Sequence, residues 1–168
     1  KQFESFLGTA QSSGHGALRI NGEEVADNLI IQYASCCNPI PGDEVFGLIS
    51  SGRGIRIHRT NCKNAKDLLL NHSDRILEAE WSKNAAVTFV TGIKVIGTDR
   101  LGMFNDISTV ISKSLKLNIR SILVNSDQGH GYFEGTIVVD VHDISELHTL
   151  IQRLYTVEGV QAVYRYEG

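Results

Sequence analysis

Three cysteines and one histidine lie in a segment so short that together they constrain its fold. Cys36 and Cys37 are adjacent, and Cys62 follows His58 by four residues, giving the pattern C-C-x20-H-x3-C. Three thiolates and one imidazole are typical ligands of a tetrahedral zinc site. His-x3-Cys is a familiar half of such a site. Adjacent cysteines point apart on an extended chain, so the Asn-Pro pair that follows must turn the chain to bring both sulfurs inward.

Two other interpretations of these residues stay open at this point. The cysteines can be small buried hydrophobic residues at a strand end, with His58 satisfying a hydrogen bond. Alternatively, Cys37 can be a nucleophile with His58 as its base, although no elbow or oxyanion motif accompanies them. A structural disulfide between adjacent cysteines is not expected, because it closes a strained ring.

A compact first unit is predicted around these residues. Its expected strands are residues 29–35, 44–50, 54–59 and 75–81, and residues 64–72 have helical character. A unit of roughly fifty residues often needs stabilisation beyond its hydrophobic core, such as a bound metal ion. We expect this domain at residues 28–83. Residues 1–27 are rich in Gly, Ser and Gln without a sustained period, which indicates a linker or partly disordered lead-in.

The second unit has the pattern of a ferredoxin-like fold. Alternating apolar residues predict a strand over 87–95, and Phe104, Ile107 and Ile111 have helical spacing. Residues 118–126 and 132–141 read as a hairpin around a glycine-rich turn. Asp143 and Glu146 form a capping-box pattern before a second helix, and a last strand ends near residue 166. The order βαββαβ is the split βαβ arrangement, so we expect an α+β protein.

Charge and hydropathy exclude some classes of protein. The net charge is −3 and the pI is about 6.1, so no global imbalance points to nucleic acid or anionic lipid. No apolar run is long enough to span a membrane, and the first residues lack the apolar core of a signal peptide. The chain also lacks an initiator Met, which indicates a piece of a longer protein. Three cysteines cannot pair completely, so we expect reduced thiols and a cytoplasmic location.

A local basic stretch contrasts with the overall acidity. Between residues 52 and 66 there is no Asp or Glu, and the cations are Arg53, Arg56, Arg59, Lys63 and Lys66. Neighbouring glycines allow such a stretch to approach a phosphate backbone closely, so these five residues are candidate RNA contacts. A solvated polar face is the alternative.

A long and unusual string within the first unit carries a family resemblance. Residues 33–62, YASCCNPIPGDEVFGLISSGRGIRIHRTNC, resemble the zinc-finger or RIS segment in the regulatory C-terminal region of long RelA/SpoT homologues, which make and hydrolyse (p)ppGpp in the bacterial stringent response. The matching elements are Cys36-Cys37, Pro39, Pro41-Gly42-Asp43, Gly47, Gly52-Arg53-Gly54, His58 and Cys62. The resemblance implies zinc as cofactor, with Cys36, Cys37, His58 and Cys62 as its ligands.

The same resemblance implies that an ACT domain follows, here at residues 87–168. Residues 95–108, VIGTDRLGMFNDIS, resemble the ACT loop and first helix. In that family the hydrolase, synthetase and TGS domains lie upstream. This fragment is therefore expected to be non-catalytic, in a parent GTP pyrophosphokinase that can also be a (p)ppGpp hydrolase. Its expected role is to contact the ribosome and tRNA and to relay the starvation signal.

An amino-acid-sensing ACT module without an RNA role is the alternative function. By resemblance to amino-acid-binding ACT domains, Asp99, Gly102 and Asn118 are the candidate ligand contacts. Leu101 and Met103 would line an apolar pocket, so branched-chain amino acids are the first candidates.

A homodimer is also expected from the second unit. Its sheet leaves an outer face and two edges available, and apolar residues there need cover. The residues expected on that face are Val90, Ile122, Val124 and Val138.

Overall fold

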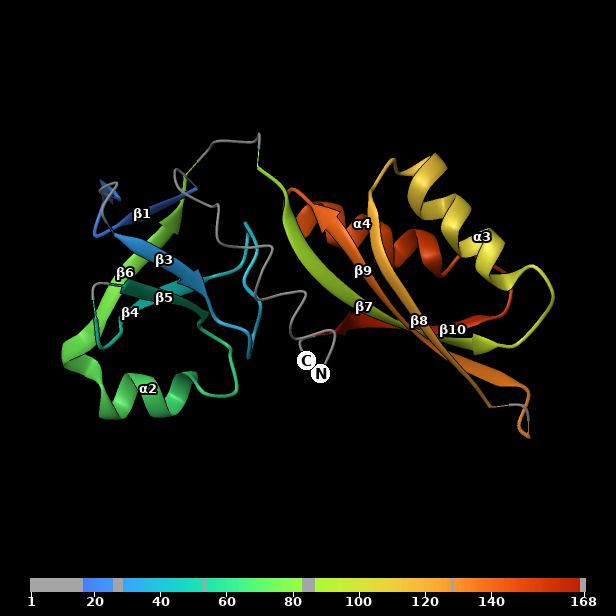
Figure 1. Cartoon of the computed structure of the whole chain (residues 1–168), viewed down its shortest axis with the longest axis horizontal. Coiled ribbons are helices and arrows are strands. Elements are labelled where there is room, and N and C mark those ends of the chain that lie inside the picture. Colours follow the sequence, from blue (N-terminus) through green and yellow to red (C-terminus); the bar gives the residue numbers. More distant parts are fainter. Residues whose placement is uncertain (1–16, 26–28, 53, 83–86, 128, 167–168) are drawn as a thin grey trace. The chain divides into compact units, whose positions relative to one another are not determined.

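The structure is a computed structural model that describes residues 17–25, 29–52, 54–82, 87–127 and 129–166. It has the predicted α+β class and forms two compact units, the first ending at Phe89 and the second spanning Val90–Tyr166 (Figure 1). None of the helices in these ranges has the length and apolar character needed to cross a membrane.

The first unit is built on a mixed six-stranded sheet with the order β2-β1-β6-β4-β5-β3. The strands are β1 (Leu18–Ile20), β2 (Glu23–Glu24), β3 (Ile30–Tyr33), β4 (Val45–Ile49), β5 (Gly54–Arg59) and β6 (Ile76–Trp81). Edge strand β3 runs parallel to β5, whereas β4 pairs antiparallel with both β5 and β6. Helix α2 (Ala65–Asn71) and the short 3-10 helix η1 (Ser73–Arg75) connect β5 to β6.

The expected irregular lead-in is wrong for the part of it that the structure describes. Leu18 pairs opposite Trp81 in β6, so β1 is an integral strand of the first sheet. Asn21 and Gly22 both have positive φ, 50° and 80°, in the turn between β1 and β2. Asn-Gly is a strong signal for a two-residue hairpin turn, but this hairpin is not among the elements predicted above. Residues 1–16 and 26–28 lie outside the described residues.

Aromatic packing joins β3 and β6 of the first unit to Phe89. The ring of Tyr33 stacks on that of Trp81 at 6.0 Å, and Phe89 meets both rings edge-on. The indole Nε1–H of Trp81 donates to the carbonyl oxygen of Asp43 at 2.9 Å. Trp81 is the single tryptophan of the chain, so its fluorescence reports on this unit alone.

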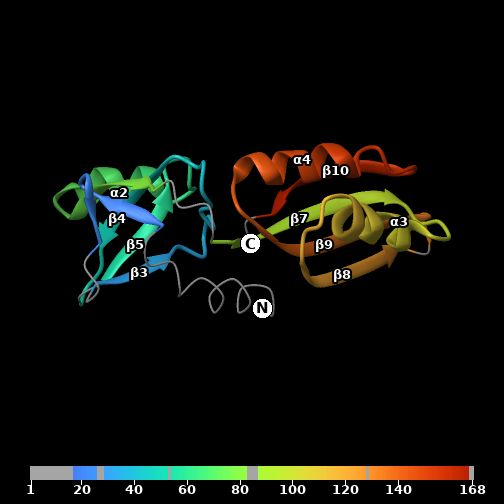
Figure 2. The same ribbon diagram turned by 90° about the horizontal axis from the view of Figure 1, so that it is seen from above.

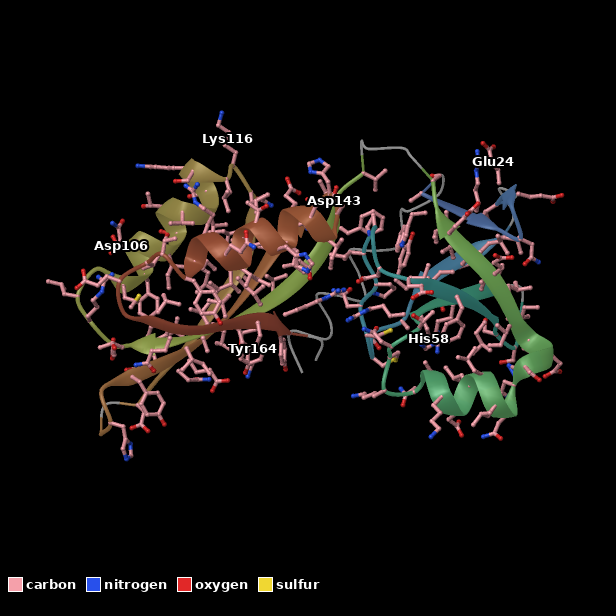
Figure 3. All side chains as sticks on the ribbon, turned by 180° about the vertical axis from the view of Figure 1, so that it is seen from behind. Glu24, His58, Asp106, Lys116, Asp143 and Tyr164 are labelled. Atoms are coloured by element: carbon pink, nitrogen blue, oxygen red, sulfur yellow. The ribbon has the colours of Figure 1, made fainter. Side chains whose placement is uncertain are left out.

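The second unit has the predicted ferredoxin-like topology. Its elements are β7 (Phe89–Thr98), α3 (Met103–Thr109), the π-helical turn η2 (Val110–Ser114), β8 (Ile119–Asp127), β9 (Tyr132–Val141), α4 (Ile144–Leu154) and β10 (Val160–Tyr166). The strand order is β10-β7-β9-β8, and both helices lie on one face of the sheet (Figures 1 to 3). Asp143 caps α4 as predicted, accepting from the backbone N–H of Glu146 at 2.9 Å.

The residues expected on the outer sheet face of the second unit are partly wrong. Ile122 pairs opposite Ile137, which is only 2% exposed, so Ile122 lies on the helix-covered side. Its neighbour Leu123 points the other way and is 61% exposed. The predicted alternation of side chains in β8 is therefore one residue out of register, and such a shift moves every side chain of a strand to the opposite face. Val90 and Val138 are buried.

Candidate metal centre

The two adjacent cysteines lie in a tight turn that follows β3. Asn38 has a positive φ of 43° and is buried, and its N–H donates to the carbonyl oxygen of Ala34 at 2.9 Å. Two residues further on, the N–H of Ile40 donates to the carboxylate of Asp43 at 2.8 Å. These bonds fold the chain back on itself, so the kink expected after the cysteines is present.

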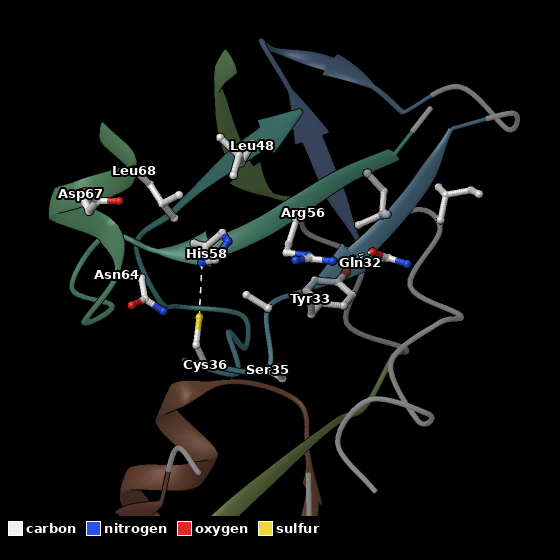
Figure 4. Close-up of a pocket in the computed structure, with 13 residues that line it drawn as sticks. Gln32, Tyr33, Ser35, Cys36, Leu48, Arg56, His58, Asn64, Asp67 and Leu68 are labelled. Carbon is white, nitrogen blue, oxygen red and sulfur yellow. Dashed lines mark hydrogen bonds between the residues drawn. The ribbon is translucent and has the colours of Figure 1, made fainter. Parts of the chain in front are cut away.

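The four predicted ligands converge in the structure. The sulfur atoms of Cys36, Cys37 and Cys62 and a ring nitrogen of His58 all lie within 4.8 Å of one another. The Sγ of Cys36 is 3.4 Å from the Sγ of Cys62 and 3.5 Å from the Nδ1 of His58. Figure 4 shows Cys36 and His58 pointing toward each other from the turn and from β5.

These separations match the size of a tetrahedral site. With Zn–S bonds of about 2.3 Å, two sulfur ligands of one zinc ion lie about 3.8 Å apart, and a sulfur and a nitrogen ligand slightly closer. Three thiol sulfurs and one imidazole nitrogen are also ligand atoms that a borderline-soft ion such as zinc prefers. The cluster could therefore hold a metal ion, with Cys36, Cys37, Cys62 and the Nδ1 of His58 as its ligands.

Neighbouring groups hold the cluster in place. The backbone N–H of Arg59 donates to the Sγ of Cys37, and its guanidinium donates to the carbonyl oxygen of Cys37, both at 3.3 Å. The same guanidinium lies 3.7 Å from the carboxylate of Asp43. The ring of Phe46 stacks on the imidazole of His58 at 5.6 Å. Arg59 thus ties the cysteine turn to the strand that carries the histidine.

Burial sets the protonation of the ligands in the metal-free chain. Burial raises the pKa of the Cys37 thiol, and it also raises the pKa of Cys36, with the hydrogen bond between Cys36 and Cys62 adding to it. Burial lowers the pKa of His58, and the positive charge of Arg56 lowers it further. The imidazole is therefore held neutral, which is the form that binds a metal.

The interpretation of Cys37 as a catalytic nucleophile does not fit this geometry. Its side chain is completely buried, and its sulfur is engaged by Arg59. The sulfur that contacts the imidazole of His58 belongs to Cys36 instead. A completely buried sulfur also has no path to a substrate.

An open groove of about 670 Å³ lies beside the cluster (Figure 4). Cys36 and His58 line one side of it, and Arg56 and Gln32 project into it from β5 and β3. Asp67 of α2 lies along the opposite wall. The groove gives solvent a path to Cys36, and nothing in the sequence pattern indicated it.

Three of the five predicted RNA-contacting residues are exposed among the residues that the structure describes. Arg56, Lys63 and Lys66 are exposed, and Arg56 donates only weakly to Gln32, at 3.4 Å. Arg59 is turned inward to Cys37 and Asp43, with its side chain 11% exposed. Arg53 lies outside the described residues. The role found for Arg59, holding the cysteine turn, could not be inferred from its place in a basic stretch.

The predicted amino-acid site does not form within one copy of the second unit. Gly102 begins α3 with a φ of 80°, and the carboxylate of Asp99 accepts from the hydroxyl of Ser126. Asn118 lies beyond the far end of the helix and donates to Asp140 at 2.8 Å. The seven residues of α3 and the five of η2 separate it from Gly102, a rise of about 18 Å.

Sequence reasoning missed an arginine in the first loop of the second unit. Arg100 donates to the carbonyl oxygen of Glu158 at 2.9 Å and to the carboxylate of Asp106 at 2.8 Å. It thereby fastens the loop to the turn before β10. A lone arginine in a loop carries no sequence signal for such a contact.

Two family models match the chain in tandem. The RelA/SpoT RIS domain matches residues 18–82, and the ACT domain matches residues 85–165. The RIS match begins at β1, ten residues before the boundary expected from sequence, in agreement with the place of β1 in the first sheet.

Curated relatives extend over most of this chain. The GTP pyrophosphokinase of Haemophilus influenzae is 34% identical over 137 residues, which are 82% of this chain and 18% of the relative. That of Escherichia coli is 28% identical over 167 residues, which are 99% of this chain and 22% of the relative. The bifunctional (p)ppGpp synthase/hydrolase RelA of Mycobacterium tuberculosis is 31% identical over 140 residues, covering 83% and 19%. The chain thus spans about a fifth of the length of these relatives.

Proposed function

The chain belongs to the RelA/SpoT family, as a RIS domain followed by an ACT domain, and from this premise we propose that it is the regulatory C-terminal region of a (p)ppGpp synthetase or synthetase/hydrolase. The tandem match of the two domains carries this proposal. The curated relatives are about five times longer than this chain, so the catalytic domains belong to the rest of the parent protein. On this account the fragment itself is not an enzyme.

The RIS unit is proposed to hold one zinc ion and to contact the ribosome and tRNA. Zinc would act structurally here, because all four ligands come from the protein and no position is left for substrate. The residues that would hold the ion lie in the turn after β3, in β5 and in the turn before α2, so a bound ion would link these three segments. Loss of any one ligand is therefore expected to loosen that part of the RIS unit.

Cations on the surface of the RIS unit support the contact with RNA. Arg56, Lys63 and Lys66 are exposed, and the five basic residues of this stretch interrupt an otherwise acidic chain. Each phosphate that a protein neutralises releases counterions, so the affinity for RNA falls with salt. The relay of this contact to the catalytic domains is the proposed regulatory output.

Sedimentation of the chain with ribosomes tests the proposed contact. Replacing Arg56, Lys63 and Lys66 with alanine is expected to weaken binding about tenfold or more at low salt and to reduce the salt slope by about 2 to 3. The matched control replaces Lys113, Lys116 and Arg153, which are exposed cations of the ACT unit. Equal losses in the two triple variants, or none in either, would contradict the proposed role of the RIS surface but would leave family membership intact.

An amino-acid site at Asp99, Gly102 and Asn118 needs a partner copy to close it, since these residues do not converge within one copy. Binding of branched-chain amino acids and a homodimer in isolation stay predictions, as does the cytoplasmic location of the parent.

A further inference from the structure

Two sulfurs of the cluster lie in van der Waals contact, and one of them lines a solvent-accessible groove. The Sγ of Cys36 lies 3.4 Å from the Sγ of Cys62, although 26 residues separate them in the chain. Cys36 is half-buried and lines the groove of about 670 Å³, whereas Cys62 is 6% exposed and Cys37 is fully buried. A small oxidant that enters the groove therefore meets Cys36 first.

We propose that Cys36 is an oxidation site at which a peroxide, such as hydrogen peroxide, converts Cys36 and Cys62 into an intramolecular disulfide. In the first step the sulfur of Cys36 attacks one peroxide oxygen, the O–O bond breaks, and water leaves, giving a sulfenic acid. In the second step the sulfur of Cys62 attacks that of Cys36, the S–O bond breaks, and a second water leaves. Two thiols are oxidised and one peroxide is reduced.

The geometry favours this pair over the other two. A disulfide needs its sulfurs to approach to about 2.05 Å, which from 3.4 Å is a small side-chain movement. A Cys36–Cys37 bond would close a strained ring between adjacent residues. The sulfur of Cys37 accepts the N–H of Arg59 at 3.3 Å and is shielded from the groove, so it has no path to the oxidant.

Oxidation would make the first unit respond to redox conditions, which goes beyond the proposed function. The disulfide uses two of the four proposed ligands, so the oxidised cluster can no longer complete a tetrahedral site. The reaction itself needs only the two thiols and peroxide. It therefore does not depend on the proposed zinc or on the ribosome contact, and it is tested on the chelated chain.

Peptide mapping of the chelated 168-residue chain gives a direct test. Trypsin leaves Cys36 and Cys37 together in peptide 20–53 and isolates Cys62 in peptide 60–63. The chain is treated with excess hydrogen peroxide, the remaining thiols are blocked, and the non-reduced digest is analysed by mass spectrometry. The expected product is a cross-link between these two peptides, abolished by dithiothreitol. It should form in the wild-type chain and in Cys37→Ser, and be lost in Cys36→Ser and Cys62→Ser.

Other products would overturn the proposal. These are a cross-link that persists in Cys36→Ser, a disulfide within peptide 20–53, and sulfinic or sulfonic acids without any cross-link. Trp81 fluorescence checks that each variant keeps the fold of the first unit. If Cys36→Ser fails to fold, fragmentation of the wild-type cross-link between positions 36 and 37 decides which sulfur is bonded. Assignment to Cys37 would overturn the proposal equally.

Discussion

At the scale of single residues, Arg59 connects the two segments that carry the ligand sulfurs. Its backbone and side chain both donate to Cys37, and its carbonyl oxygen accepts the N–H of Cys62 at 3.0 Å. Such supporting contacts orient metal ligands, and their loss typically lowers metal affinity 10- to 100-fold. Arg59→Ala removes the guanidinium but keeps the backbone contacts, so we expect a fall of about tenfold in zinc affinity.

Competition with a chromophoric chelator measures that affinity. The matched control is Lys66→Ala, which removes an exposed cation of α2. An unchanged affinity in Arg59→Ala, or equal losses in both variants, would show that the guanidinium does not support the cluster.

Cys62→Ser removes one proposed ligand from a buried position. Large destabilisations, about 4 kcal/mol or more, are characteristic of the loss of a structural metal from a small domain. We expect a loss of that size for the zinc-loaded first unit, followed through Trp81 fluorescence in urea. The second unit, followed by its own transition in circular dichroism, is expected to unfold as in the wild type. Asn61→Ser, at an exposed neighbouring position, is the control and should leave both transitions in place.

At the scale of secondary structure, a close contact between β7 and the turn before β10 limits what the second unit tolerates. A Cβ on Gly97 of β7 would lie 2.6 Å from the carbonyl oxygen of Gly159 and 3.1 Å from the ring of Phe133. Gly97→Ala is therefore expected to destabilise this unit by about 2 kcal/mol or more, lowering its melting temperature by roughly 10 °C. Gly135→Ala is the control, because its nearest contact is an ordinary 3.6 Å. Equal melting temperatures for the two variants would contradict this account of the turn.

Strand order in the second unit could be predicted from local sequence signals, and the grouping of the four cluster residues in the first from their spacing together with the family resemblance. Asp143 with Glu146 marked the start of α4, and the spacing of His58 and Cys62 marked half of the cluster. The pairing of β1 with β6 could not be predicted from composition, since it depends on a partner about sixty residues away. The sheet face on which Ile122 lies could not be predicted either, because a pattern of period two carries no information about which side the helices cover.

At the scale of the whole molecule, the chain consists of two units with separate cores and different candidate roles. The RIS unit combines a four-residue cluster with exposed cations, and the ACT unit provides a ferredoxin-like sheet covered on one face. All four cluster residues lie in the RIS unit, so metal binding by the cluster can be measured on this chain alone. The central claim is that this cluster is a zinc site.

Metal analysis combined with X-ray absorption tests that claim most directly. The chain would be produced with zinc supplied and purified under reducing, chelator-free conditions. We expect one zinc ion per chain, with three sulfur ligands at about 2.3 Å and one nitrogen ligand at about 2.0 to 2.1 Å. Absence of stoichiometric metal from a folded, fully reduced chain, or a first shell of oxygen and nitrogen without sulfur, would contradict it.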